Sequence, residues 1–387
     1  MRKALFLATV VIGGLLIAAS ARAQQAPPPR DVQISTADGT VLRATYFAAA
    51  APGPGVILLH QCNRQRKVWD PLAASLAASG IHVLTLDFRG FGESGGTPVD
   101  KLTPQQAADT QDKIWPGDVD AAFEHLVSTK GVDRNFIGAG GASCGVNQAV
   151  QLARRHPGVK SLALLSEGTN IDGRKFLRKS PNLPLLGAAA EDDPDLGVVE
   201  IMQWLSDLSP DVSNKFVHYT SGGHGVEMFE AHKDLPGMIV EWFQETLKEP
   251  PSAPVTRASG WSMSAESRLL ELLDQDEGDK VAAMYEEQHK RDPNAKFFSE
   301  VVINRMGYEH LVAEDFQGAL AYFKLNVLAY PNSPNAYDSL GDGYEVLGQK
   351  DLARQNAKKA IDLLATDTVD SQQRRDAIKA SAEQKLK

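Results

Sequence analysis

The chain has 387 residues, with 40 Lys and Arg against 49 Asp and Glu, and therefore a formal charge of −9. This acidic balance argues against nucleic acid or anionic lipid as a partner. The length exceeds what a single hydrophobic core usually holds, so we expect two domains.

The N-terminal segment 1–23 predicts a secretory signal peptide. A basic start precedes an uncharged apolar run from Ala4 to Ser20, and the triplet Ala21-Arg22-Ala23 has the small-x-small pattern of a cleavage site. The run is shorter than the roughly 20 residues that span a bilayer, which favours cleavage after Ala23 over an uncleaved anchor. Cleavage removes three basic residues and changes the formal charge from −9 to −12. We expect a periplasmic or secreted mature protein without a membrane span.

From residue 31 to residue 247, short apolar runs alternate with stretches of helical period, as in parallel strands joined by crossover helices. The pattern predicts an α/β fold with a doubly wound, mostly parallel sheet. The expected strands cover residues 32–35, 41–47, 56–59, 81–86, 135–139, 159–165, 185–190 and 215–220. The expected helices cover residues 69–79, 119–128, 146–156 and 228–247, the last of them interrupted near Pro236-Gly237.

A proline-rich stretch ends this first part of the chain and predicts a linker at residues 251–262. The predicted domains are therefore 24–250 and 263–387. In the second of them, Gly307 and Gly341 have the same spacing as Ala319 and Ala353. This spacing matches the period of about 34 residues that tetratricopeptide repeats have, so we expect an all-α repeat domain. Such repeats imply a peptide or protein partner, a second copy of the chain, or packing against the catalytic mouth as a lid.

The segment Gly141-Ala142-Ser143-Cys144-Gly145 has the G-x-S-x-G pattern of a nucleophile elbow. It lies between a predicted strand and a predicted helix, which is the context that an elbow requires. The sharp turn strains the serine backbone and leaves room only for small neighbours, which the two glycines supply. Ser143 is the predicted nucleophile.

With this elbow, residues 31 to 247 resemble the α/β-hydrolase superfamily, and the short core is similar to dienelactone hydrolases. That subgroup has Cys at the elbow centre, where this chain has Ser143. Only the short segment 166–184 separates Leu165 from Leu185, where lidded hydrolases place a helical cap. The resemblance therefore implies a capless, open site.

The resemblance also implies a catalytic acid and a histidine, which follow the serine in that order. Asp193, in the turn after the strand that ends at Ala190, is the favoured acid, and Asp192 is the alternative. His224 lies in a glycine-flanked loop after the last strand. A Ser143-His224-Asp193 triad would cleave an ester or related acyl bond of a small-molecule substrate through an acyl-enzyme.

The oxyanion hole of such a site needs two fixed donors. The backbone N–H of Cys144 is one candidate, and the N–H of Cys62 or, alternatively, of Gln61 is the other. Two donors to one oxygen bring their Cα atoms within disulfide range, and an oxidising compartment favours the bond. We therefore predict a Cys62–Cys144 disulfide, with two buried free thiols as the alternative.

Two other functions remain open at this stage. One is a binding or scaffold protein in which the repeats carry the function and the α/β part is inactive. The other is thiol chemistry at Cys144, which is disfavoured because the side chain after the elbow centre points away from the pocket. The sequence contains no metal-ligand cluster and no nucleotide fingerprint, so we expect neither a cofactor nor a metal.

Overall fold

The computed structural model describes residues 26–248, 262–275, 278–292 and 298–387. The predicted signal peptide and nearly all of the predicted linker lie outside these residues. We refer to residues 26–248 as the sheet domain and to residues 262–387 as the helical region. Among the helices formed by the described residues, none combines the length and the apolar composition needed to cross a bilayer.

The sheet domain is built on one eight-stranded sheet with the order β1-β2-β4-β3-β5-β6-β7-β8. Strands β3 to β8 are parallel, whereas β2 is antiparallel to both β1 and β4. The strands are β1 (Arg30–Ser35), β2 (Val41–Phe47), β3 (Gly53–Leu59), β4 (His82–Leu86), β5 (Val132–Ala142), β6 (Val159–Leu165), β7 (Leu185–Ala190) and β8 (Lys215–Tyr219). The predicted α/β class with a mostly parallel sheet is confirmed.

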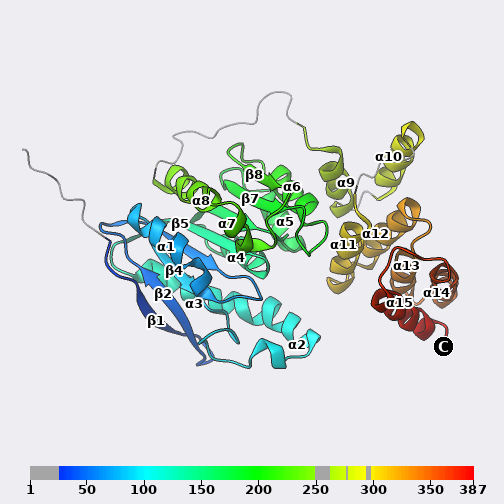
Figure 1. Cartoon of the computed structure of the whole chain (residues 1–387), viewed down its shortest axis with the longest axis horizontal. Helices are drawn as coiled ribbons and strands as arrows, with labels where there is room; N and C mark the ends of the chain where they lie inside the picture. Colours follow the sequence, from blue (N-terminus) through cyan, green and yellow to red (C-terminus); the bar gives the residue numbers. More distant parts are fainter. Residues whose placement is uncertain (1–25, 249–261, 276–277, 293–297) are drawn as a thin grey trace, which may run out of the picture.

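Helices cover both faces of this sheet (Figure 1). On one face lie α3 (Trp115–Ser128), α4 (Cys144–Arg155), α5 (Ile171–Leu177) and α6 (Val198–Leu208); on the other lie α1 (Asp70–Ala78), α7 (Met228–Ala231) and α8 (Leu235–Phe243). Side chains alternate between the two faces along each strand, so Ile57 packs on the first face and Leu58 on the second.

Two local predictions need correction. The predicted helix 228–247 breaks at residues 232–234 rather than at Pro236, because Pro236 lies in the first turn of α8, where its missing N–H costs nothing. The sequence pattern also did not predict α2 (Pro104–Asp109), the π-helical turn at Thr110–Ile114, α5 and α6. The α2 segment and α5 are short, and their polar residues mask a helical period.

The helical region contains α9 (Ala265–Asp274), α10 (Gly278–Arg291), α11 (Glu300–Val312), α12 (Phe316–Ala329), α13 (Pro334–Val346), α14 (Lys350–Leu364) and α15 (Gln372–Lys385). The pair α13/α14 follows the pair α11/α12 at the same interval that separates Gly307 from Gly341. A side chain at Gly307 would collide with Phe323 of α12, so the two helices of the first pair pack closely. A C-terminal region of several helices is therefore present as expected. Its assignment to the tetratricopeptide repeats stays a prediction.

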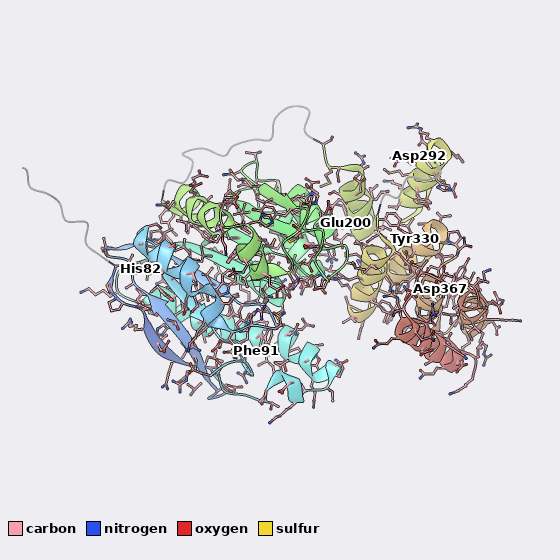
Figure 2. All side chains as sticks on the ribbon, in the orientation of Figure 1. His82, Phe91, Glu200, Asp292, Tyr330 and Asp367 are labelled. Atoms are coloured by element: carbon pink, nitrogen blue, oxygen red, sulfur yellow. A yellow bond between two sulfur atoms is a disulfide. The ribbon has the colours of Figure 1, made fainter. Side chains whose placement is uncertain are left out.

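The helical region packs directly on the sheet domain, and side chains from both fill the boundary (Figure 2). One cluster of buried apolar side chains runs from α6, through Trp204 and Leu205, into α9 and α11, through Leu270 and Val302. Gly197, at the start of α6, approaches Val302 so closely that a Cβ would collide with it. The two parts thus share apolar packing.

A buried ion cluster fastens the same boundary. The guanidinium of Arg174 on α5 contacts Asp274 of α9 at 2.8 Å and Glu309 of α11 at 2.8 Å, and Arg178 also pairs with Asp274. Both Arg174 and Asp274 are almost fully buried, with 2% and 0% of their side chains exposed. Burial alone would raise the pKa of Asp274, but His310 and the two arginines hold that pKa well below its usual range. Asp274 is therefore ionised at neutral pH.

We predict that Asp274→Asn lowers the free energy of unfolding by about 3–5 kcal/mol, because it leaves two arginines facing a neutral group in a buried site. Urea unfolding of the full chain measures this loss. The control Glu230→Gln removes an exposed ion pair with Lys233 and should leave the free energy of unfolding nearly unchanged. Equal small losses in both variants would contradict a role of the cluster in joining the two parts.

Candidate active site

Ser143, Asp193, His224 and Cys62 all follow strands of the parallel part of the sheet. Ser143 follows β5, Asp193 follows β7, His224 follows β8 and Cys62 follows β3. The carboxyl ends of parallel strands meet at one edge of the sheet, which is where ligands bind in open α/β folds. The topology therefore brings residues that are far apart in the sequence to one place.

The turn at Ser143 has the strained geometry of an elbow. Ser143 has φ 50° and ψ −128° as the residue that precedes α4, and its N–H donates to the carbonyl oxygen of Leu165 at 2.9 Å. A Cβ at Gly141 would collide with the carbonyl of Gly145, and a Cβ at Gly145 would collide with the carbonyl of Leu59. Both glycines are therefore required by close backbone packing.

His224 is held by a buried carboxylate. Its Nδ1 lies 2.9 Å from each carboxylate oxygen of Asp193, and the two side chains are 9% and 1% exposed. Asp192 instead accepts hydrogen bonds from the N–H groups of Gly222 and Gly223, at 2.8 and 2.9 Å. These contacts favour Asp193 over Asp192 as the acid of a triad and assign Asp192 to shaping the histidine loop.

The electrostatic surroundings of His224 favour its charged form. Burial lowers the pKa of the imidazole, but the hydrogen bond to Asp193 and the charges of Asp193, Asp195 and Glu167 outweigh burial and raise the pKa above 6.5. Asp195 Oδ2 lies 3.7 Å from Nδ1. Among the described residues, no hydrogen bond joins the Ser143 hydroxyl to His224, and such bonds often tighten only when substrate binds.

Cys62 and Cys144 form a disulfide with a Cα–Cα distance of 5.8 Å. Within the described chain, neither backbone N–H of these two residues donates a hydrogen bond to a protein acceptor. Cys144 is the first residue of α4, so its N–H is one of the free donors of a helix N-terminus. Two unused donors, joined by one covalent bridge, thus flank Ser143.

Gln61 and His60 have other partners. The Gln61 side chain is buried, and its Oε1 accepts the N–H of Val226 at 2.9 Å, which ties the loop after β3 to the histidine loop. His60 Nε2 accepts the N–H of Phe88 at 3.1 Å, and its Nδ1 lies 2.8 Å from the carbonyl oxygen of Gln61. These contacts describe positioning residues. They involve the side chain and the carbonyl of Gln61, so its N–H stays the alternative to the N–H of Cys62 as the second donor.

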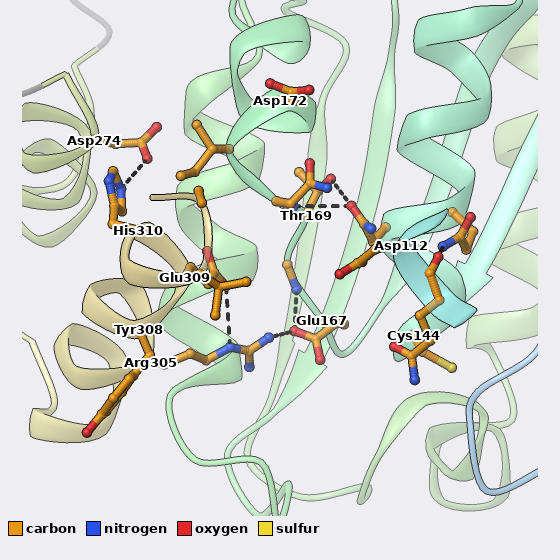
Figure 3. A pocket seen from close by; sticks show the side chains of 18 of the residues that line it. Asp112, Cys144, Glu167, Thr169, Asp172, Asp274, Arg305, Tyr308, Glu309 and His310 are labelled. Atoms are coloured by element: carbon orange, nitrogen blue, oxygen red, sulfur yellow. Dashed lines mark hydrogen bonds and ion pairs between the residues drawn. The ribbon is translucent and has the colours of Figure 1, made fainter. Parts of the chain in front are cut away.

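A cavity of about 1090 Å³ opens beside Ser143, and α11 forms one of its walls (Figure 3). The expectation of an open site is wrong in this respect, because Arg305, Tyr308 and Val312 of the helical region line the cavity together with Ser143. Arg305 pairs with Glu167, the second residue after β6. Sequence reasoning missed these wall residues. The sequence feature related to this wall is a pair of arginines, Arg174 and Arg178, in the short β6–β7 connection, which pair with carboxylates of α9 and α11.

One group of side chains has metal-ligating chemistry among the described residues. Asp193, Asp195 and His224 offer ligand atoms within 4.8 Å of one another. The two carboxylate oxygens of Asp193 already face His224 Nδ1 at 2.9 Å. The group therefore matches an acid–imidazole pair, and we assign it no metal.

Comparison with known proteins agrees with this architecture. The family model described as "Serine aminopeptidase, S33" matches residues 50–197. The chain is 31% identical over 114 residues to the thiohydrolase aneE of Aspergillus aculeatus, which covers 29% of this chain and 33% of that protein. It is 29% identical over 140 residues to the acyltransferase drtE of Aspergillus calidoustus, which covers 36% and 43%. The chain thus spans less than half of the length of each of these curated relatives.

Among solved structures, an esterase of Pyrococcus furiosus is similar with a TM-score of 0.46 and 19% identity, over 57% of this chain and 93% of the esterase. The sheet order, the elbow and the family match over residues 50–197 together give the sheet domain the α/β-hydrolase fold. The helical region lies outside the matched segment.

We predict that alkylation of the native, unreduced protein finds no free thiol, and that the Cys62→Ala, Cys144→Ala double variant is less stable. The bridge closes a loop with a sequence separation of 82 residues, for which chain entropy gives about 4.5 kcal/mol. Mass spectrometry counts the thiols, and urea unfolding compares the variant with reduced wild type, which should match it. Two alkylated cysteines in unreduced, folded protein would contradict the disulfide.

Proposed function

We propose that this protein is an exported serine hydrolase that cleaves an ester or thioester through Ser143, His224 and Asp193. The observation that carries the proposal is the joint placement of a strained serine elbow and a buried Asp193–His224 pair at one edge of the sheet. The disulfide supports export, since such bonds persist in oxidising compartments.

The chemistry proceeds through an acyl-enzyme. Ser143 Oγ attacks the carbonyl carbon while His224 Nε2 takes the hydroxyl proton, and Asp193 stabilises the resulting imidazolium through Nδ1. The N–H groups of Cys144 and Cys62 hold the oxyanion. The bond to the leaving oxygen or sulfur then breaks, and His224 returns the proton to that leaving group. Water repeats the sequence, releases the acid and regenerates Ser143.

The relatives are compatible with either acyl bond. Two of them carry names that state thiohydrolase and acyltransferase activity, and both reactions transfer an acyl group. The alternative is a binding or scaffold protein in which the helical region carries the function. A reactive Ser143 distinguishes the two hypotheses, because a scaffold has no need of an activated nucleophile.

We predict that a fluorophosphonate probe labels the wild type, and that Ser143→Ala abolishes labelling and lowers ester hydrolysis by about 10⁴-fold or more. The control Ser128→Ala changes an exposed serine on α3 and should keep both activities. Gel detection of the probe and a chromogenic acetate ester provide the measurements. If folded wild-type protein remains unlabelled, the scaffold hypothesis is favoured.

We also predict a specific pH dependence of kcat/KM. His224 must be neutral to accept the serine proton, so activity falls as the pH drops through its raised pKa, and the acidic limb lies at higher pH than an unperturbed imidazole would give. Asp195→Asn removes one of the charges that raise this pKa and should move the limb to lower pH. The control is Glu191→Gln. Glu191 lies, like Asp195, in the turn after β7, and its carboxylate pairs with His218. An unmoved limb in Asp195→Asn would contradict the assignment of the limb to His224.

A further inference from the structure

The cavity beside Ser143 has walls from two parts of the chain that are far apart in sequence. Its sheet-domain wall includes Gln111, Asn147 and Thr169, and its other wall is formed by Arg305, Tyr308 and Val312 of α11. Figure 3 shows the α11 side chains facing those of the sheet domain across the cavity. Cavities that enclose drug-sized ligands measure roughly 300–1,000 Å³. At about 1090 Å³, this one can hold a large organic group.

The position of the cavity relative to the proposed machinery indicates which half of a substrate it holds. Its lining includes Ser143 and both cysteines of the proposed oxyanion hole, whereas His224 is not among the described residues that line it. The leaving group must lie next to His224, which protonates it. The cavity, on the oxyanion side of Ser143, is therefore on the side of the acyl group.

We propose that this cavity is the acyl-binding subsite of the hydrolase and that α11 is its cap, so that the helical region determines which acyl groups are accepted. The proposal rests on the function proposed above and deepens it. Lidded hydrolases insert a cap between β6 and β7, and here the same connection carries α5, on which the helical region docks. The cap comes from the C-terminal end of the chain.

Direct contacts hold α11 in this position. Arg305 pairs with Glu167 across the cavity wall, and its Nε lies 3.7 Å from Glu309 Oε1 on the next turn of α11. Glu309 in turn pairs with the buried Arg174 of α5 at 2.8 Å. Tyr308, which also lines the cavity, donates to Asp342 of α13 at 2.7 Å, so α13 supports the position of α11. The wall is thereby fixed by polar contacts on both of its sides.

The lining also suggests the chemical class of the acyl group. Gln111, Asn147, Thr169 and Arg305 line the cavity together with Ile171, Tyr308, Val312 and the disulfide. Within this lining the Thr169 hydroxyl donates to Asn147 Oδ1 at 2.8 Å, and Arg305 pairs with Glu167. The Gln111 Oε1 and the side-chain N–H groups of Asn147 have no hydrogen-bond partner among the described residues, and a plain alkyl chain would leave them without one. We therefore infer a large acyl group that carries hydrogen-bonding atoms, such as an amide, in preference to a fatty acyl chain.

The test compares para-nitrophenyl esters of acetic acid, decanoic acid and N-benzoylglycine in variants of the full chain. Val312 is 77% exposed at the end of α11 and lines the cavity, so Val312→Trp narrows the subsite without disturbing the core. We expect the ratio of kcat/KM for the N-benzoylglycyl ester over the acetyl ester to fall about tenfold or more. The matched control is Val369→Trp, at a residue that is 92% exposed and outside the cavity, and its ratio should stay within about twofold of wild type.

Each outcome of this comparison decides a part of the proposal. An unchanged ratio in Val312→Trp, or an equal change in Val369→Trp, overturns the role of α11. A wild-type enzyme that prefers the decanoyl ester to the N-benzoylglycyl ester overturns the polar acyl class. If the wild-type protein shows no ester hydrolysis that Ser143→Ala abolishes, the proposed function itself is rejected.

A photoreactive probe gives a second and independent readout. A fluorophosphonate loses fluoride as the bond from Ser143 Oγ to phosphorus forms, and the chain on phosphorus then occupies the acyl position. With a diazirine at the end of that chain, we expect irradiation to cross-link residues 300–315, identified by peptide mass spectrometry. Cross-links confined to the sheet domain would overturn the proposal, whereas absence of Ser143 labelling would count against the proposed function.

Discussion

The strained turn at Ser143 is the constraint on which the geometry of the site depends. Ser143 adopts a positive φ only because Gly141 and Gly145 allow the ends of β5 and α4 to approach β3 and each other. This close approach brings the loop after β3 next to the start of α4, so Cys62 and Cys144 can be joined covalently. The same loop, through the buried Gln61 side chain, also holds the histidine loop in place. One backbone requirement thus positions the nucleophile and the surrounding loops together.

The second level of organisation is the boundary between the sheet domain and the helical region. Apolar packing around Trp204 joins the two parts, because the shared cluster extends from α6 into α9 and α11. The buried ions around Arg174 and Asp274 add directional contacts to it. Replacing such pairs by apolar residues is often neutral or stabilising, so they contribute little to stability by themselves. Their effect is to allow only one arrangement, since a shifted helical region would leave buried charges unpaired.

The sequence predicted the strands and indicated the candidate residues because these depend on short-range patterns. The alternation of apolar runs places strands such as β6 and β7 within their observed bounds, and the elbow pattern identifies Ser143 from its immediate neighbours. Asp193 and His224 follow from their places after β7 and β8. The wall of the cavity could not be predicted in this way, because Arg305 and Glu167 are 138 positions apart and pair only after both parts fold. No periodicity within α11 distinguishes a helix that covers a cavity from one that faces water.

The origin of the wall also explains why the sheet domain can do without an inserted cap. A cap inserted between β6 and β7 must be connected to the sheet at both of its ends. The short segment 166–184 leaves room only for α5 and its turns. A cap from the C-terminal end is free of that restriction, since only one connection leads to it. It must then be fastened by side chains instead of by chain continuity, which accounts for arginines on and beside α5 that face carboxylates on α9 and α11. The short β6–β7 connection, which by itself predicts an open site, therefore has a different consequence: α5 acts as the docking platform for a wall that comes from elsewhere in the chain.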